Sequence, residues 1–445
     1  MIAPLPAAQS APSEPLASSR LSWPPGDPDE LRALAELGFN ELSAAIGGIG
    51  EIHEAVAERV FRAVGPGATI ARAAHDAISR RVYAAVSGGP TVVGRAADAA
   101  LGKRDRSGER RLSTTPWGGL GLAAINGLVG NALERERSVL QEPMAVRVDG
   151  RAVPCEAKAL AEAFPAASPR IVVFVHGLMG TEYPWLWGGG PSRECYGSRL
   201  DGDLGATAVY TRYNTGRHIS ENGHSLAELM AELVAAWPVE VDQLALVGHS
   251  MGGLVCRSAC YQASEQGAEW ISHVGHVVSL GTPHMGAPLA QGVHYASAAL
   301  HVVPETRPFA RFLRRRSGGI RDLRHGSLVD QDWLDRDPDA LRAAACKEVP
   351  LLEGATHCFV AATIMDNPKH PVARLLGDCL VLEPSAAGRS RTRRIPFEAE
   401  YGMCIGRTHH IALLNHPLVY DQLREWLATP SARLAALARE TDCHE

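Results

Sequence analysis

The sequence predicts an α/β fold in which a mostly parallel central sheet is flanked by helices. Three short apolar segments have the composition of buried parallel strands, with few charges and many aliphatic residues: residues 170–175, 243–247 and 275–280. The second segment leads through a glycine-bounded turn into residues 254–261, which have the pattern of a helix. Strands that alternate with helical segments are typical of α/β proteins.

The turn after residues 243–247 carries a candidate nucleophile. It reads Gly248-His249-Ser250-Met251-Gly252, with the serine at its apex. Between a strand and a helix, such a turn is strained and holds the hydroxyl above the edge of the sheet. Small residues are needed on both sides of the serine because the strand and the helix pass close together there. The pattern also occurs by chance, so the flanking strand and helix are what make Ser250 a candidate.

A second motif follows the strand at residues 170–175. It reads His176-Gly177-Leu178-Met179-Gly180 and begins 74 residues before Ser250. A loop of this kind can aim one backbone N–H toward the reaction centre, and the residue after the serine supplies another. We therefore expect the amides of Leu178 and Met251 to form an oxyanion hole. His176, Gly177 and His249 are expected to support it, and a glycine-rich turn without chemistry is the alternative.

A serine hydroxyl needs a base to activate it, and the base needs an orienting carboxylate. In this architecture the chain order is serine, then acid, then histidine. Asp366 follows the strand-like residues 358–365, and Asp378 lies in a glycine-marked turn before an apolar run. His409 and His410 are adjacent later in the chain. From these patterns alone, both acids and both histidines remain candidates.

Five segments resemble those of the serine lipases and esterases of the α/β-hydrolase superfamily. The likeness is to bacterial triacylglycerol-lipase-like proteins and to GPI-inositol-deacylase-like esterases, and it covers roughly residues 144–428. In the acid turn, Cys379 replaces the glycine that the family usually has. The segments that carry the resemblance are residues 175–180, 248–253, 280–288, 377–386 and 410–417.

The resemblance favours Asp378 over Asp366 and His410 over His409. It implies an α/β-hydrolase fold in which Ser250 attacks, His410 is the base and Asp378 orients the base. Such a mechanism needs no metal and no organic cofactor. The resemblance also implies that the substrate is an acyl or lipid-like ester. An acyltransferase or a thioesterase would use the same triad and stays an alternative.

A long insertion separates the strand at residues 275–280 from the acid turn. Residues 287–345 have a helical pattern, and a segment of this length between strands is usually functional. In lipase-like proteins this place carries a lid, so we expect these residues to cover an apolar Ser250 pocket. Trp185 and Trp187, just after the oxyanion loop, are expected either to line an acyl pocket or to pack in the ordinary way.

Composition limits the partners that this chain is expected to have. The net charge of −5 argues against binding to nucleic acid. The nine cysteines are scattered and contain no C-x-x-C pair, which argues against a disulfide framework and a zinc site. The first residues lack the charged and apolar regions of a signal peptide, which favours a cytoplasmic protein. Peripheral contact with a lipid surface is an alternative, and the oligomeric state stays open.

The chain before residue 140 differs from the rest. Residues 1–28 are rich in Pro, Ala and Ser and are expected to be disordered, and residues 29–140 have a helical pattern. Residues 112–133 carry no charge but contain proline, asparagine and five glycines, which favours a buried or interfacial helix over a membrane span.

We expect the N-terminal helices to form a separate layer that contributes no triad residue. They would dock on the rest of the chain through Trp117, Leu120 and Leu122. The alternating residues 144–153 surround an Asp-Gly turn and predict a β-hairpin, where the hydrolase domain (144–428) begins. Residues 429–445 are expected to be a tail.

Overall fold

The computed structural model describes residues 111–187, 194–287, 316–337, 346–368 and 373–429, together with residues 29, 30, 33, 34, 37, 340 and 370. Several predicted segments lie outside these residues. They are the N-terminal segment 1–28, most of the N-terminal helices, the first part of the predicted lid and nearly all of the C-terminal tail.

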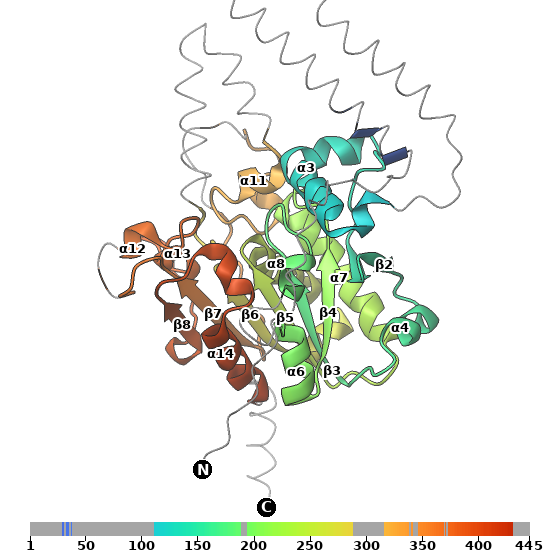
Figure 1. Cartoon of the computed structure of the whole chain (residues 1–445). Coiled ribbons are helices and arrows are strands. Elements are labelled where there is room, and N and C mark those ends of the chain that lie inside the picture. Colours follow the sequence, from blue (N-terminus) through green and yellow to red (C-terminus); the bar gives the residue numbers. More distant parts are fainter. Residues whose placement is uncertain are drawn as a thin grey trace, which may run out of the picture.

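An eight-stranded sheet forms the centre of the molecule (Figure 1), in the order β2-β1-β4-β3-β5-β6-β7-β8. All neighbouring pairs from β4 to β8 are parallel, and β1 is antiparallel to both β2 and β4. The predicted mostly parallel sheet is therefore confirmed. The strands are β1 (Ala145–Val148), β2 (Arg151–Val153), β3 (Arg170–Val175), β4 (Thr207–Arg212), β5 (Gln243–His249), β6 (Val274–Leu280), β7 (Thr356–Ala362) and β8 (Gly402–Ile405).

The hairpin predicted around residues 144–153 is β1 and β2. Val146 pairs with Val153, and Val148 pairs with Arg151. The two turn residues both have positive φ, 49° at Asp149 and 77° at Gly150. An Asp-Gly pair tolerates this conformation, which matches the twist of two antiparallel strands.

Helices cover both faces of the sheet. They are α3 (Pro116–Arg135), α4 (Ala157–Ala163), α5 (Tyr183–Leu186), α6 (Tyr196–Leu204), α7 (Ile219–Ala236), α8 (Met251–Gln266), α11 (Gly318–Asp322), α12 (Ala373–Leu376), α13 (Glu383–Ala386) and α14 (Pro417–Ala428). Short 3₁₀ helices are η2 (Leu112–Thr114), η3 (Glu269–His273), η5 (Asp330–Asp332), η6 (Ala399–Tyr401) and η7 (His410–Leu414).

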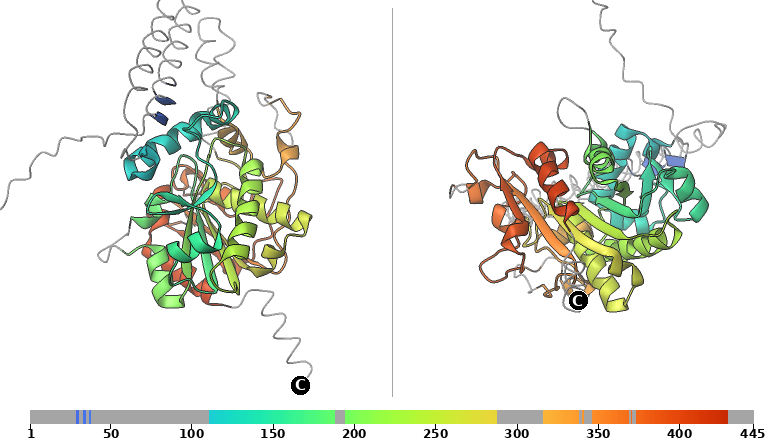
Figure 2. Two further views of the ribbon diagram at one scale, coloured as in Figure 1. Left: turned by 90° about the vertical axis from the view of Figure 1, so that its right-hand side faces the viewer. Right: turned by 90° about the horizontal axis from the view of Figure 1, so that it is seen from below.

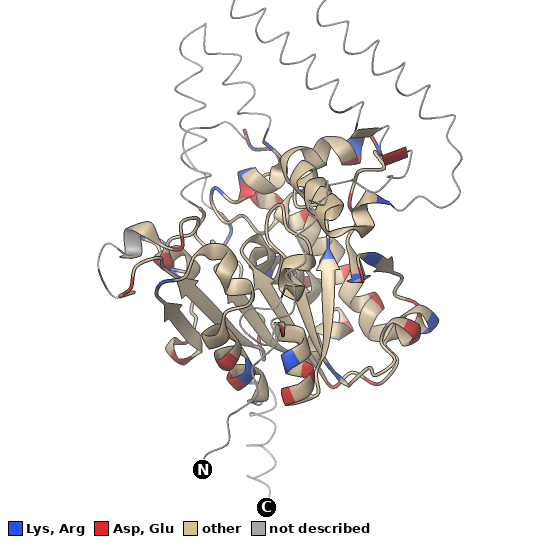
Figure 3. Cartoon of the chain, in the orientation of Figure 1, with Lys and Arg blue, Asp and Glu red and all other residues tan. Residues whose placement is uncertain are grey.

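Two hydrophobic clusters hold these layers together. Alternate residues of β3 face opposite sides, so that Val173 packs with α7 and α8 while Phe174 packs with α6 and α14. Strands β5, β6 and β7 contain no Lys, Arg, Asp or Glu, and Figure 3 shows the charged residues on the surrounding helices and loops instead. Because these strands are buried on both faces, they read as continuous apolar segments in the sequence.

Helix α3 lies at one end of the sheet beside α11 (Figures 1 and 2). It begins where the Thr115 side chain accepts a hydrogen bond from the Gly118 amide, and Pro116 is its first residue. Leu122 is buried, but it packs in a cluster with Leu112, Leu133 and Leu140 of the N-terminal region, so its burial is not the expected docking on the rest of the chain. The Trp117 side chain is 69% exposed and its ring lies 6.4 Å from that of Trp187, and Leu120 is half-buried. Among the described residues, no helix combines the length and hydropathy that crossing a membrane requires.

Candidate active site

Ser250 lies at a strained turn between β5 and α8. Its φ of 54° and ψ of −124° are rare for a residue other than glycine. The turn is held because the Ser250 amide donates to the Leu280 carbonyl at the end of β6, at 2.8 Å. A Cβ at Gly248 would overlap the Gly253 backbone, and one at Gly252 would overlap the Val175 carbonyl. The glycines on both sides of the serine are therefore required by packing.

Asp378 and His410 form a buried pair. Asp378 Oδ2 lies 2.6 Å from His410 Nδ1, and both side chains are almost fully buried. The other carboxylate oxygen, Oδ1, accepts from the amides of Leu380 at 3.0 Å and Val381 at 2.8 Å. The His410 amide also donates to the Asp378 carbonyl at 3.1 Å. These contacts fix the carboxylate, which in turn fixes the imidazole, with Nδ1 facing Asp378.

The competing candidates lie elsewhere. Asp366 is on the surface, where its carboxylate pairs with Arg407 at 2.6 Å. His409 is exposed, whereas its neighbour His410 is buried. The structure thus pairs Asp378 with His410 and leaves the side chains of Asp366 and His409 exposed at the surface.

The elements that carry Ser250 and His410 meet at the carboxyl end of the central strands. The His249 ring lies 4.6 Å from the His410 ring, and His249 Nε2 donates to the His410 carbonyl at 3.1 Å. A Cβ at Gly281 would lie 3.2 Å from His410 Cε1 and 3.2 Å from Asp378 Oδ2. The Ser250 hydroxyl makes no hydrogen bond with a described residue, so its contact with His410 stays a prediction. Catalytic hydrogen bonds are often longer in an enzyme without substrate.

The predicted oxyanion loop lies directly against the serine. A Cβ at Gly177 would come within 2.8 Å of the Ser250 Cβ, so only glycine lets the loop approach this closely. Within the described part of the chain, the amides of Leu178 and Met251 have no protein acceptor. The next amide, that of Met179, donates to Thr215 Oγ1 at 3.1 Å. Sequence patterns do not reveal Thr215, because it lies on a loop after β4 and belongs to no motif.

The two tryptophans after this loop are placed differently. Trp185 is 1% exposed and packs 5.0 Å from the Phe174 ring and edge-on to His249. This is ordinary core packing, the second of the two expected roles. Trp187 is half exposed and lies 6.4 Å from the Trp117 ring.

The described part of the predicted lid contacts the site. Helix α11 is close enough to the nucleophile helix that a Cβ at Gly319 would lie 2.8 Å from Met251 Cε. Residues 288–315 form the rest of the insertion before α11, and they are not among the described residues.

Several buried histidines couple stability to pH. Burial lowers the pKa of His176, which precedes the oxyanion loop, from 6.5 to about 3, and lowers the pKa of His276 and of His357 to about 4. Each of these pKa values is lower in the folded chain than in the unfolded chain. The unfolded chain therefore binds more protons below pH 6.5, and stability is lost as the pH falls.

We therefore expect the free energy of unfolding to fall between pH 6.5 and pH 4, by about 1.4 kcal/mol per pH unit for each of these histidines. Urea unfolding midpoints at pH 7.5, 6.5, 5.5 and 4.5 measure this. A midpoint that rises or stays constant over this range would contradict it. The variant His357→Gln should flatten the slope, because a glutamine at this position binds no proton.

Comparison with known proteins relates part of the chain to serine esterases. Residues 166–307, about a third of the chain, match the family described as "Putative serine esterase (DUF676)". No curated protein matches the sequence. The chain is similar to the mature lipase BlEst2 of Bacillus licheniformis, at 20% identity over 59% of this chain and 94% of that one, with a TM-score of 0.38.

Two further solved structures are similar. EstA of Clostridium botulinum is 13% identical over 70% of this chain and 98% of its own, with a TM-score of 0.36. An esterase of Pyrobaculum calidifontis is 14% identical over 58% of this chain and 73% of its own, with a TM-score of 0.33. The mostly parallel sheet, the serine at the turn after β5 and the family match over a third of the chain support a serine hydrolase with the α/β-hydrolase fold.

Proposed function

We propose that the protein is a serine carboxylester hydrolase, an esterase or lipase, that acts through Ser250, His410 and Asp378. The observation that carries the proposal is the buried 2.6 Å contact between Asp378 and His410, beside a serine held at a strained turn. A carboxylate, an imidazole and a serine in this arrangement can make the hydroxyl nucleophilic at neutral pH.

In the proposed reaction, Ser250 Oγ attacks the ester carbonyl carbon while His410 Nε2 takes the hydroxyl proton. The amides of Leu178 and Met251 donate to the oxygen that becomes negative in the tetrahedral intermediate. The intermediate collapses, the C–O bond to the alcohol breaks, and His410 returns the proton to the leaving alcohol. Water then attacks the acyl-enzyme by the same route and releases a carboxylic acid. Asp378 orients the imidazole and stabilises its charged form.

The proposed substrate is a small-molecule ester with an apolar acyl group. Exposed apolar side chains support this: Leu186 and Trp187 follow the oxyanion loop in the chain, and the ring of Trp117 lies 6.4 Å from that of Trp187. Each CH₂ of an acyl chain that leaves water for such a surface contributes about 0.8 kcal/mol to binding. The same side chains would suit peripheral contact with a lipid surface.

A series of p-nitrophenyl esters from acetate to palmitate tests the proposed function. We expect hydrolysis of the esters, with kcat/KM rising with chain length up to a maximum, because longer chains bury more apolar surface. The matching acyl thioesters and an added alcohol acceptor run in parallel. Faster turnover of the thioesters would favour a thioesterase. A product that is mainly the transferred ester would favour an acyltransferase. No turnover of any ester would overturn the proposal.

A further inference from the structure

The face of α3 that is turned toward the site lies in direct contact with the oxyanion loop. A Cβ at Gly127 would overlap Met179 Cγ and would lie 3.2 Å from Thr215 Oγ1. One turn later, the Gly130 carbonyl accepts from Asn214 Nδ2 at 3.1 Å. Glycine is present at these positions because the backbone of α3 approaches the loops with no room for a side chain.

Met179 is the residue of the loop that this contact affects most. Its φ is 56°, a conformation that non-glycine residues adopt rarely and that persists only when the surroundings hold it. Two contacts do so, the hydrogen bond from its amide to Thr215 Oγ1 and the packing of Gly127 over its side chain. The proposed oxyanion donor, the Leu178 N–H, belongs to the peptide between Gly177 and Leu178, one peptide before the Met179 amide that Thr215 holds. Because Leu178 links these two peptides, holding Met179 limits how far the Leu178 N–H can turn.

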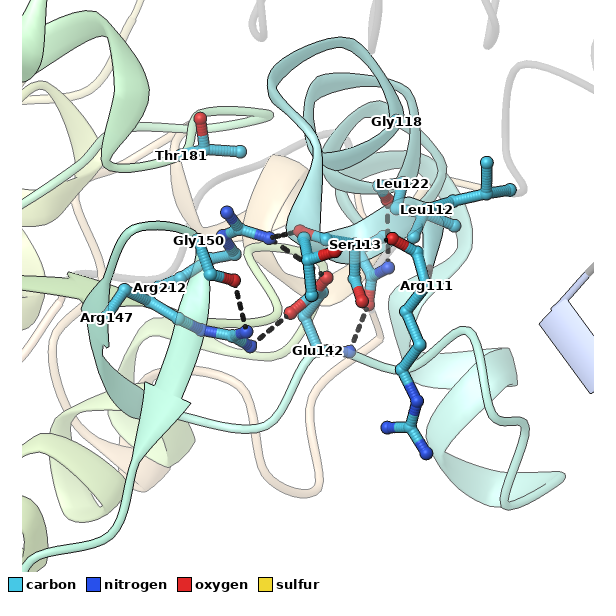
Figure 4. Close-up of polar contacts among 12 residues, drawn as sticks. Arg111, Leu112, Ser113, Gly118, Leu122, Glu142, Arg147, Gly150, Thr181 and Arg212 are labelled. Carbon is cyan, nitrogen blue, oxygen red and sulfur yellow. Dashed lines mark hydrogen bonds and ion pairs between the residues drawn. The ribbon is translucent and has the colours of Figure 1, made fainter. Parts of the chain in front are cut away.

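The residues just before α3 are attached to the far end of the loop through Arg212. Arg212 donates to the Ser113 carbonyl at 2.5 Å (Figure 4). It also pairs with Glu182, two residues beyond Gly180, at 2.6 Å. Glu142, after the end of α3, pairs with Arg147 at 2.6 Å and lies 3.5 Å from Arg212. These four charged side chains are all buried. Buried ion pairs of this kind are costly to break, so the attachment is firm.

Helix α3 also holds the element beside the second oxyanion donor. The Ser317 hydroxyl donates to the Gly127 carbonyl at 2.6 Å, and the Gly318 amide donates to Asn131 Oδ1 at 2.6 Å. These bonds fix the first residues of α11 on α3. Gly319, the next residue, packs against the Met251 side chain. One helix therefore contacts the surroundings of both proposed donors.

We propose that α3 is a positioning element of the oxyanion hole, acting through the contact of Gly127 with Met179. This inference rests on the proposed function. The N-terminal residues were predicted to form a separate layer. Instead, residues 112–142 pack against the loop that carries Leu178 and are linked to it through hydrogen bonds and ion pairs of Arg212. Residues of α3 touch no reacting atom; they set the direction of an amide that does.

Two alanine substitutions within α3 test this. Gly127→Ala places a methyl group against Met179, whereas Gly121→Ala is the matched control because a Cβ there meets nothing within 4 Å. Alanine favours helix over glycine at both positions. We expect Gly127→Ala to lower kcat for a short ester about tenfold or more, since removal of a whole oxyanion donor costs about 10²- to 10³-fold. KM should change less than about twofold, and Gly121→Ala should match the wild type.

A transition-state readout separates positioning from general destabilisation. The affinity of an alkylboronic acid, which forms a tetrahedral adduct with the serine, should fall by the same factor as kcat in Gly127→Ala. The unfolding temperature should stay within a few degrees of the wild type. In the double variant Gly127→Ala/Met179→Ala the methyl group has room, so kcat should recover to within about threefold of Met179→Ala alone.

The outcomes distinguish this inference from the proposed function. If the wild type hydrolyses the short ester and Gly127→Ala does so equally well, α3 does not position the loop. The inference is also overturned if Gly127→Ala loses activity together with thermal stability and the double variant restores neither. If the wild type hydrolyses no ester, the proposed function fails, whatever the variants do.

Discussion

Replacing Ser250 with alanine is expected to lower kcat for p-nitrophenyl esters by about 10⁵- to 10⁶-fold, the usual effect of removing the nucleophile of a triad. The hydroxyl is the group that forms the acyl-enzyme, and no neighbouring side chain can replace it. Labelling by a fluorophosphonate probe should disappear at the same time. The φ of 54° at Ser250 is strained for serine and alanine alike. The substitution therefore leaves this strain unchanged, and the unfolding temperature should change little.

The exposed Ser272→Ala is the matched control for this experiment. It removes a hydroxyl from the surface, far along the chain from the turn, and should keep both full activity and full labelling. A folded Ser250→Ala protein that hydrolyses esters at nearly the wild-type rate would rule out the proposed mechanism. Loss of labelling in Ser272→Ala would show that the probe reports on something other than the nucleophile.

Asp378→Asn is expected to lower kcat about 10⁴-fold with little effect on KM. The amide has the same shape as the carboxylate and can still accept from the amides of Leu380 and Val381. It cannot, however, stabilise a positive charge on His410, and its NH₂ group would face Nδ1 and favour the wrong tautomer. The rates of hydrolysis of a short ester, measured from pH 6 to pH 9, test this expectation.

Asp366→Asn is the matched control, because the sequence offers both acids after the serine and before the histidines. Its carboxylate pairs with Arg407 on the surface, where losing the pair should leave kcat within about twofold of the wild type. An inactive Asp366→Asn enzyme beside an active Asp378→Asn enzyme would reverse the assignment of the acid.

The local motifs of this chain are readable from its sequence because each depends on neighbouring residues. The apolar segments at β3, β5 and β6 are buried on both faces, and the hairpin of β1 and β2 turns at an Asp-Gly pair that tolerates positive φ. The glycines around Ser250 are required by the close passage of β5 and α8. In each case the chemical cause lies within a few residues of the feature that it determines.

The pairing of side chains that lie far apart in the chain was decided by the tertiary structure. The resemblance to lipases favoured Asp378 and His410, but the residue patterns left Asp366 and His409 open, since 32 residues separate the paired groups. Trp117 illustrates the same limit: it begins an apolar run, yet its side chain is mostly exposed, while Gly127 and Gly130 of the same helix face the loops of the site. Hydrophobicity identifies residues that prefer burial, but which face of a helix is buried depends on the loops it meets. Only the folded chain brings Gly127 to Met179, because that contact depends on the shape of two backbones and leaves no pattern in either segment.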